Sequence, residues 1–155
     1  MQMVEAETDT PGLRAQKLAL RELLRSSLAE HKAEIILEEW SRAEMTIAHQ
    51  LACQSEPALL RQDIGMTDEK RKEKGIFDAL RGRPRYPDLD DMQDGMPTLI
   101  ELRVAADEVL EDYFVIRILG ASGGDRNALV LLGKGHVTKV AERLRAMGHV
   151  VGVRP

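Results

Sequence analysis

The chain has 155 residues, of which 43% are apolar, 31% charged and only 3% aromatic, and its formal net charge is −4. This composition is typical of a soluble globular protein, and it excludes a chain that coats nucleic acid or anionic membrane over its whole surface. No segment reaches the roughly 18 consecutive apolar residues that a membrane-spanning helix needs, so we expect a cytoplasmic protein with no membrane contact. Cys53 is the single cysteine, which excludes an internal disulfide.

The first part of the chain is predicted to be helical. After an N-terminus expected to be disordered over residues 1–12, neither glycine nor proline occurs from Leu13 to Glu56. This span is either one long helix or a helical hairpin, and Ser27 and His31 lie near the most plausible break. Both alternatives predict helix throughout.

Two shorter helices are expected next. The stretch SEPALLRQDIG offers Ser55 as a helix cap and Gly65 as a stop, and TDEKRKEKGIFDALRG offers Thr67 as a cap and Gly82 as a terminator. Residues 13–82 are therefore predicted to form a helical region of two to four helices.

The second part of the chain is predicted to be a separate small domain. Residues 83–97 hold three prolines and four aspartates, which indicates an irregular connector. Residues 98–155 are predicted to fold as α-β-β-α-β with a mixed sheet, so that the whole chain belongs to the α+β class. The first helix begins at Thr98 (a strand over 98–104 is the alternative), and YFVIRILG and ALVLLG form a hairpin around ASGGDRN. The helix HVTKVAERLRAMG and the strand VVGV follow.

An apolar stripe in the helical region suggests the first candidate function. Its members recur at spacings of three and four residues, which places them on one helix face: Ile36, Trp40, Ala43, Ile47 and Leu51. If this face is not covered within the monomer, it is an interface for a second copy of the chain or for another protein. The first expectation is therefore a non-enzymatic adaptor that acts through its helical region.

A second function is suggested by the arginines of the connector. The sequence RGRP from Arg81 to Pro84 resembles an AT-hook, and Arg85 follows it. The resemblance implies that Arg81, Arg83 and Arg85 contact the minor groove of A·T-rich DNA. The alternative is a solvated connector in which these arginines pair with the aspartates that follow.

A third function is suggested by the stretch LLGKGHVTKVAERLRAMGHVV. A strand that runs through a Gly-rich loop into a helix presents free N–H groups to a ligand, so Lys134, Gly135 and His136 are predicted to bind an anion such as a phosphate or nucleotide. The stretch also resembles the first strand–helix–strand unit of glycosyltransferases with two Rossmann domains. The resemblance spans Leu131 to Val151 and implies only this local path, because no donor-binding half follows Pro155. The alternative is that the glycines are ordinary turn residues.

Enzymatic chemistry has little support in the sequence. His49 and Cys53 lie four residues apart, but two ligands are too few for a metal site. The pair could act as thiolate and base, but the sequence names no oxyanion donor or orienting group, and the alternative is that Cys53 is a small core residue. We therefore predict no catalytic residue, no metal and no cofactor.

Overall fold

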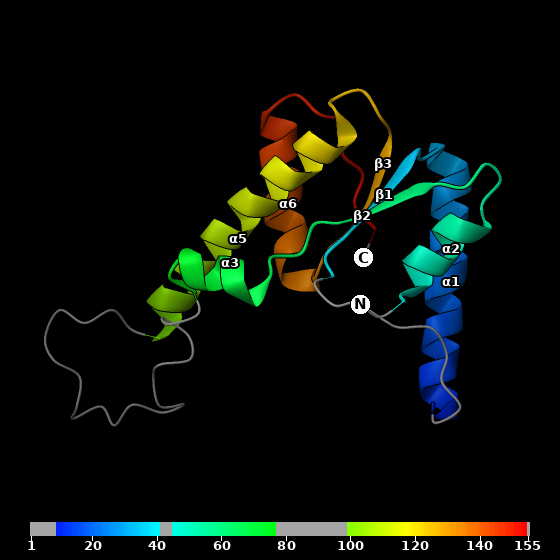
Figure 1. Cartoon of the computed structure of the whole chain (residues 1–155), viewed down its shortest axis with the longest axis horizontal. Helices are drawn as coiled ribbons and strands as arrows, with labels where there is room; N and C mark the ends of the chain where they lie inside the picture. Colours follow the sequence, from blue (N-terminus) through cyan, green and yellow to red (C-terminus); the bar gives the residue numbers. More distant parts are fainter. Residues whose placement is uncertain (1–8, 41–44, 77–98, 155) are drawn as a thin grey trace, which may run out of the picture.

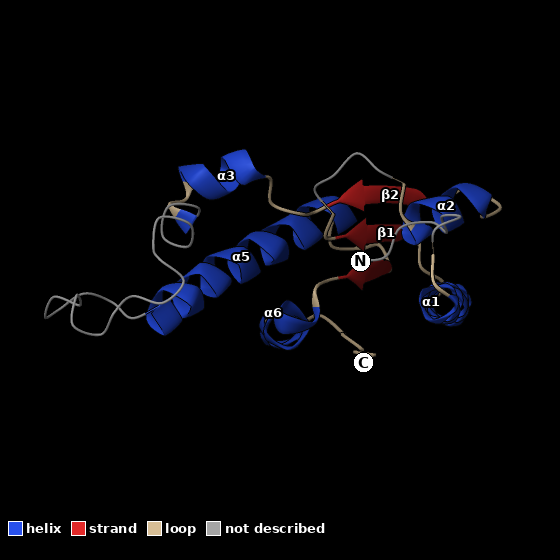
Figure 2. Ribbon diagram, turned by 90° about the horizontal axis from the view of Figure 1, so that it is seen from below, coloured by secondary structure: helices blue, strands red, loops and turns tan. Residues whose placement is uncertain are grey.

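The computed structural model describes residues 9–40, 45–76 and 99–154 (Figure 1). In this part of the chain, three short strands form a sheet between two layers of helices (Figure 2). The elements in chain order are α1 (Pro11–His31), β1 (Ile35–Glu38), α2 (Ile47–Gln54), β2 (Leu60–Asp63), α3 (Asp68–Glu73), α5 (Leu99–Ser122), β3 (Ala128–Leu131) and α6 (Lys134–Ala146). The chain is thus of the α+β class, as predicted.

The sheet has the order β2-β1-β3, and both strand pairs are parallel. Ile35 pairs with Leu60 on one side and with Ala128 on the other. The central strand β1 therefore joins a strand from the predicted helical region to a strand from the predicted C-terminal domain. All four side chains of β1 are buried, because helices cover both faces of the strand.

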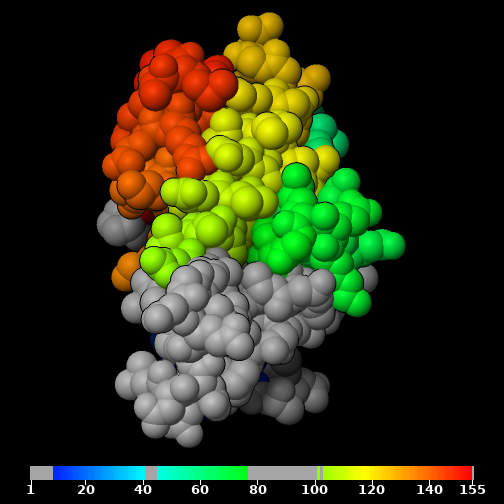
Figure 3. Space-filling model, turned by 90° about the vertical axis from the view of Figure 1, so that its left-hand side faces the viewer, coloured from blue at the N-terminus to red at the C-terminus, as the bar shows by residue number. Residues whose placement is uncertain are grey.

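The helices divide between the two faces of the sheet. Leu24 of α1 and Leu51 of α2 are buried against one face, and Phe114 of α5 and Val140 of α6 are buried against the other. In Figure 3, α5 lies between α6 and α3 on the face that this view presents. The described part of the chain has no helix with the length and apolar character needed to cross a membrane.

The helix ends follow local sequence signals. Thr10 caps α1 by accepting a hydrogen bond from the Leu13 N–H at 3.3 Å, and Pro11 occupies the first turn. Thr67 caps α3 in the same way, as predicted. Helix α1 continues through Ser27, whose side chain is buried, and ends at His31, the other residue that marked the predicted break.

Four predicted elements are wrong. Residues 35–38 form β1 instead of helix, and SEPALLRQDIG contains the strand β2. The predicted strand YFVIRILG lies within α5. The alternative strand over 98–104 is also wrong, because residues 99–104 belong to the same helix. VVGV forms no strand. The sheet is accordingly parallel, where a mixed sheet was predicted. The strand in ALVLLG and the helix in HVTKVAERLRAMG are confirmed.

Candidate functional site

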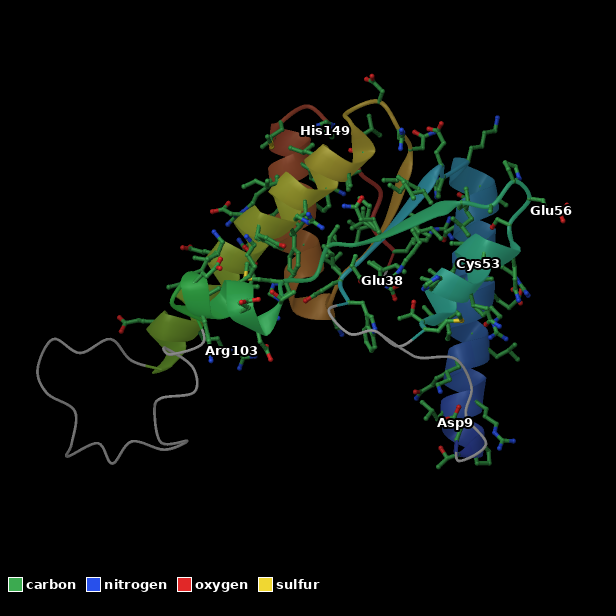
Figure 4. The ribbon with its side chains drawn as sticks, in the orientation of Figure 1. Asp9, Glu38, Cys53, Glu56, Arg103 and His149 are labelled. Atoms are coloured by element: carbon green, nitrogen blue, oxygen red, sulfur yellow. The ribbon has the colours of Figure 1, made fainter. Side chains whose placement is uncertain are left out.

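The three strands end at one edge of the sheet because they are parallel. The last residues of β1, β2 and β3 are Glu38, Asp63 and Leu131, and they share one register level. The carboxyl edge of a parallel sheet carries the loops that lead into the crossover helices, and ligands of such folds bind there. Figure 4 shows Glu38 where β1 ends.

A buried ion pair lies at this edge. The side chain of Glu38 is fully buried, and its Oε2 atom accepts hydrogen bonds from Arg61 Nε at 3.0 Å and Arg61 Nη2 at 2.7 Å. The hydroxyl of Thr46 donates a further hydrogen bond to the same oxygen at 2.7 Å. Thr46 also caps α2 through the His49 N–H at 3.1 Å, so the ion pair is joined to the start of that helix.

Asp63 extends this network towards solvent. Its two carboxylate oxygens each accept one hydrogen bond from Arg61, at 3.0 Å, in a forked arrangement. The backbone carbonyl of Asp63 accepts a hydrogen bond from Arg117 Nη2 of α5 at 2.8 Å. Asp63 thus lies between two guanidinium groups, and its side chain remains 41% exposed.

A pocket of about 540 Å³ opens where β2 ends, next to α3 and α5. Its wall combines two aromatic side chains with charged and small residues: Trp40, Asp63, Gly65, Thr67, Glu69, Lys70, Glu73, Tyr113 and Arg117. Lys70 and Glu73 face each other at 3.9 Å on the surface of α3. Of the predicted site residues that the structure describes, Trp40 alone contributes to this wall.

A carboxylate of the protein lies beside the predicted anion site at the start of α6. Lys134, Gly135 and His136 form the first turn of α6, as the sequence indicated. However, the carboxylate of Glu39 accepts the Gly133 N–H at 2.6 Å. A Cβ on Gly133 would lie 3.1 Å from Glu39 Oε2, so the glycine allows this close approach. Glu39 therefore places a negative charge beside the start of α6, and this charge would repel an external anion.

His136 packs inward and does not project from this turn. Its ring contacts Phe114 edge to face, with ring centroids 5.4 Å apart. Its Nδ1 lies 3.9 Å from Glu111 Oε1, beyond hydrogen-bond distance, and Glu111 is bound by Arg143 at 3.2 Å. These contacts indicate that His136 contributes to packing between α5 and α6.

The predicted interface stripe does not form one helix face. Ile36 lies in β1, whereas Ile47 and Leu51 lie in α2, and all three are buried in the core between the sheet and the α1–α2 layer. Trp40 follows β1 and is partly buried, and Ala43 lies outside the described residues. The three buried side chains are therefore not available to a partner in the folded chain.

The remaining candidates from the sequence are the arginines of the connector and the single cysteine. Arg81, Arg83 and Arg85 lie outside the described residues, so contact with DNA stays a prediction. Cys53 is exposed on α2, where a small core residue was the alternative (Figure 4). Within the ranges that the structure describes, no three His, Cys, Asp or Glu side chains are arranged to hold a metal ion.

Sequence reasoning missed Glu38, Arg61, Asp63 and Arg117. Asp63 ends β2, a partly exposed edge strand whose four residues include only one apolar side chain, so no apolar run marks this strand in the sequence. No protein-family model, curated protein or solved structure matches the chain.

Proposed function

We propose that the protein binds a small, planar, polar organic molecule in the pocket at the carboxyl end of β2. The observation that carries this proposal is the pocket itself, in which Trp40 and Tyr113 share a wall with Asp63 and Arg117. Its volume of about 540 Å³ falls within the range of about 300–1,000 Å³ that is typical of small-molecule sites.

The composition of the wall selects the chemistry of the ligand. Trp40 and Tyr113 offer aromatic surface to a planar group, whereas Asp63 accepts hydrogen bonds and Lys70 donates them. Among the ionisable groups in the wall, three are acidic and two are basic, and behind Asp63 the charge of Arg61 is offset by the buried Glu38. The acidic groups therefore outnumber the basic ones, which favours a neutral ligand over an anionic one.

Two of the other functions have weaker support. An adaptor that uses Ile36, Ile47 and Leu51 would have to expose core side chains. An anion at Lys134, Gly135 and His136 would lie close to the Glu39 carboxylate, which binds the neighbouring Gly133 N–H and would repel it. The pocket at β2 has neither obstacle.

A thermal-shift screen tests the proposal. We expect planar, polar compounds such as ribonucleosides to raise the unfolding temperature, because a ligand that binds only the folded state stabilises it. Tyr113→Ala should abolish the ligand-induced shift, and Ile116→Ala should preserve it, because Ile116 lies on the same helix but is 69% exposed and outside the pocket.

The ligand-induced shift is the readout because Tyr113→Ala also removes core contacts and lowers the starting stability. A shift that survives Tyr113→Ala would place binding elsewhere on the protein. The absence of any shift across the screen would contradict the proposal.

A further inference from the structure

Resting on the proposed pocket, we propose that its ligand presents a pair of neighbouring hydroxyl groups to Asp63, so that the ligand class is the ribonucleosides. Asp63 lines the pocket and is the acidic residue there that the fold holds most firmly. Glu69 and Glu73 belong to the exposed surface of α3, a helix of only six residues.

The carboxylate of Asp63 has acceptor capacity to spare. An ionised carboxylate accepts about four hydrogen bonds, and Arg61 supplies two of them, one to each oxygen. The side chain is 41% exposed, so the remaining acceptor positions are open to a ligand in the pocket. Two adjacent oxygens with one open position each match two donors on neighbouring carbon atoms.

The charges around Asp63 are compatible with neutral donors. Arg61 binds both Asp63 and the buried Glu38, and Arg117 binds the backbone carbonyl of Asp63, so two guanidinium groups are offset by two carboxylates. A hydroxyl group donates a hydrogen bond to the Asp63 carboxylate without changing this balance of charge. Asp63 is thus suited to a diol.

The position of the Asp63 carboxylate is fixed by Arg61, which is itself bound to a buried residue. Arg61 Nη2, which binds Asp63 at 3.0 Å, also binds the fully buried Glu38 at 2.7 Å. Glu38 lies on the central strand and is held by Thr46 as well. Asp63 therefore loses little side-chain freedom when a ligand binds, which raises both affinity and discrimination.

The aromatic side chains in the wall indicate the second part of the ligand, a planar ring system. Trp40 and Tyr113 lie in the same wall as Asp63 and suit the planar base that a ribonucleoside carries beside its hydroxyl pair. A simple sugar has the hydroxyl groups but no planar ring system, and a free base has the ring system but no diol.

Titration calorimetry with matched ligands tests this inference on the unmodified protein. The probes are the common ribonucleosides and their dideoxy counterparts, which retain the base and lack the sugar hydroxyl pair. We expect the ribonucleoside to bind about tenfold more tightly or better, because hydrogen bonds to a charged acceptor are stronger than those between neutral groups.

Asp63→Asn should reduce the ratio of the two affinities to about one and leave the dideoxy affinity unchanged, since the amide keeps the shape of the side chain but has one acceptor oxygen where the carboxylate has two. Asp68→Asn is the matched control and should keep the ratio, because Asp68 is exposed on α3 and lies outside the pocket wall. Circular dichroism checks that both variants fold. If Asp63→Asn does not fold, the ratio of the two affinities on the unmodified protein tests the diol by itself.

The outcomes separate the two proposals. Equal affinity for both sugar forms, with binding that Tyr113→Ala abolishes, would overturn the diol while the pocket stands. Binding of planar compounds other than nucleosides, with no binding of nucleosides, would likewise overturn the diol and leave the pocket in place. If no planar compound binds, the proposed function itself fails.

Discussion

The ion pair of Glu38 and Arg61 has its charges almost entirely shielded from water, because the Glu38 side chain is fully buried and that of Arg61 is only 12% exposed. Removal of one partner leaves the other charge uncompensated in a medium of low dielectric constant. We expect Arg61→Met to lower the free energy of unfolding by about 3–5 kcal/mol, as measured by urea denaturation.

The double variant Arg61→Met/Glu38→Met provides the control for this prediction. It removes both charges, and it also removes Glu38 Oε1, which is buried and has no hydrogen-bond partner in the structure. Apolar replacements of buried ion pairs are often neutral, so the double variant should regain most of the lost stability. A double variant as unstable as Arg61→Met would show that the arginine acts through packing and not through charge.

The site residues were difficult to recognise in the sequence because their roles depend on the sheet. Asp63 lies beside Glu38 and in the pocket wall only because β2 is parallel to β1 and ends beside it. Arg117 reaches Asp63 across 54 positions of the chain, and no local pattern encodes that contact. Glu39 is likewise brought to Gly133 by the pairing of β1 with β3.

Secondary-structure elements were predicted best where the apolar spacing and the residues at the ends of the segment indicate the same element. Helix α6 has amphipathic spacing and ends next to Gly148, whose positive φ of 91° suits a glycine. Strand β1 was missed because Ile36 begins a series that continues at helical spacing through Trp40 to Leu51, and a short strand buried on both faces has the same apolar pattern as a buried helix turn. The β-branched and aromatic run from Tyr113 was misread because local propensity is overridden when a long helix continues through it.

Ile116 and Ile118 distinguish the helix in α5 from the strand that local propensity predicts. Two residues apart, they would share a face in a strand but lie on nearly opposite faces of a helix. Their side chains are 69% and 5% exposed, respectively. We expect Ile118→Ala to cost about 2–5 kcal/mol of unfolding free energy and Ile116→Ala at most about 0.5 kcal/mol, both measured in urea. Equal costs for the two substitutions would contradict the helix.

The whole molecule depends on a sheet that takes strands from both halves of the sequence. The sheet joins β1 and β2, which precede residues 77–98, to β3, which follows them. Ile35 pairs directly with Leu60 and with Ala128, so β3 loses its strand partner when the first half unfolds, and β1 loses one of its two partners when the second half unfolds. The two layers of helices are anchored on opposite faces of this one sheet.

We therefore expect residues 13–82 and 98–155 to unfold in a single cooperative transition and not as independent domains. Trp40 is the only tryptophan and reports on the carboxyl edge of the sheet, whereas far-ultraviolet circular dichroism reports mainly on the helices. In urea, the two signals should share one midpoint. Leu24→Ala, which opens a cavity in the α1–α2 layer, should lower both midpoints equally, because the helices on the opposite face lose their support at the same time. A tryptophan transition that precedes the loss of helix would show instead that the sheet edge opens while one helical layer persists.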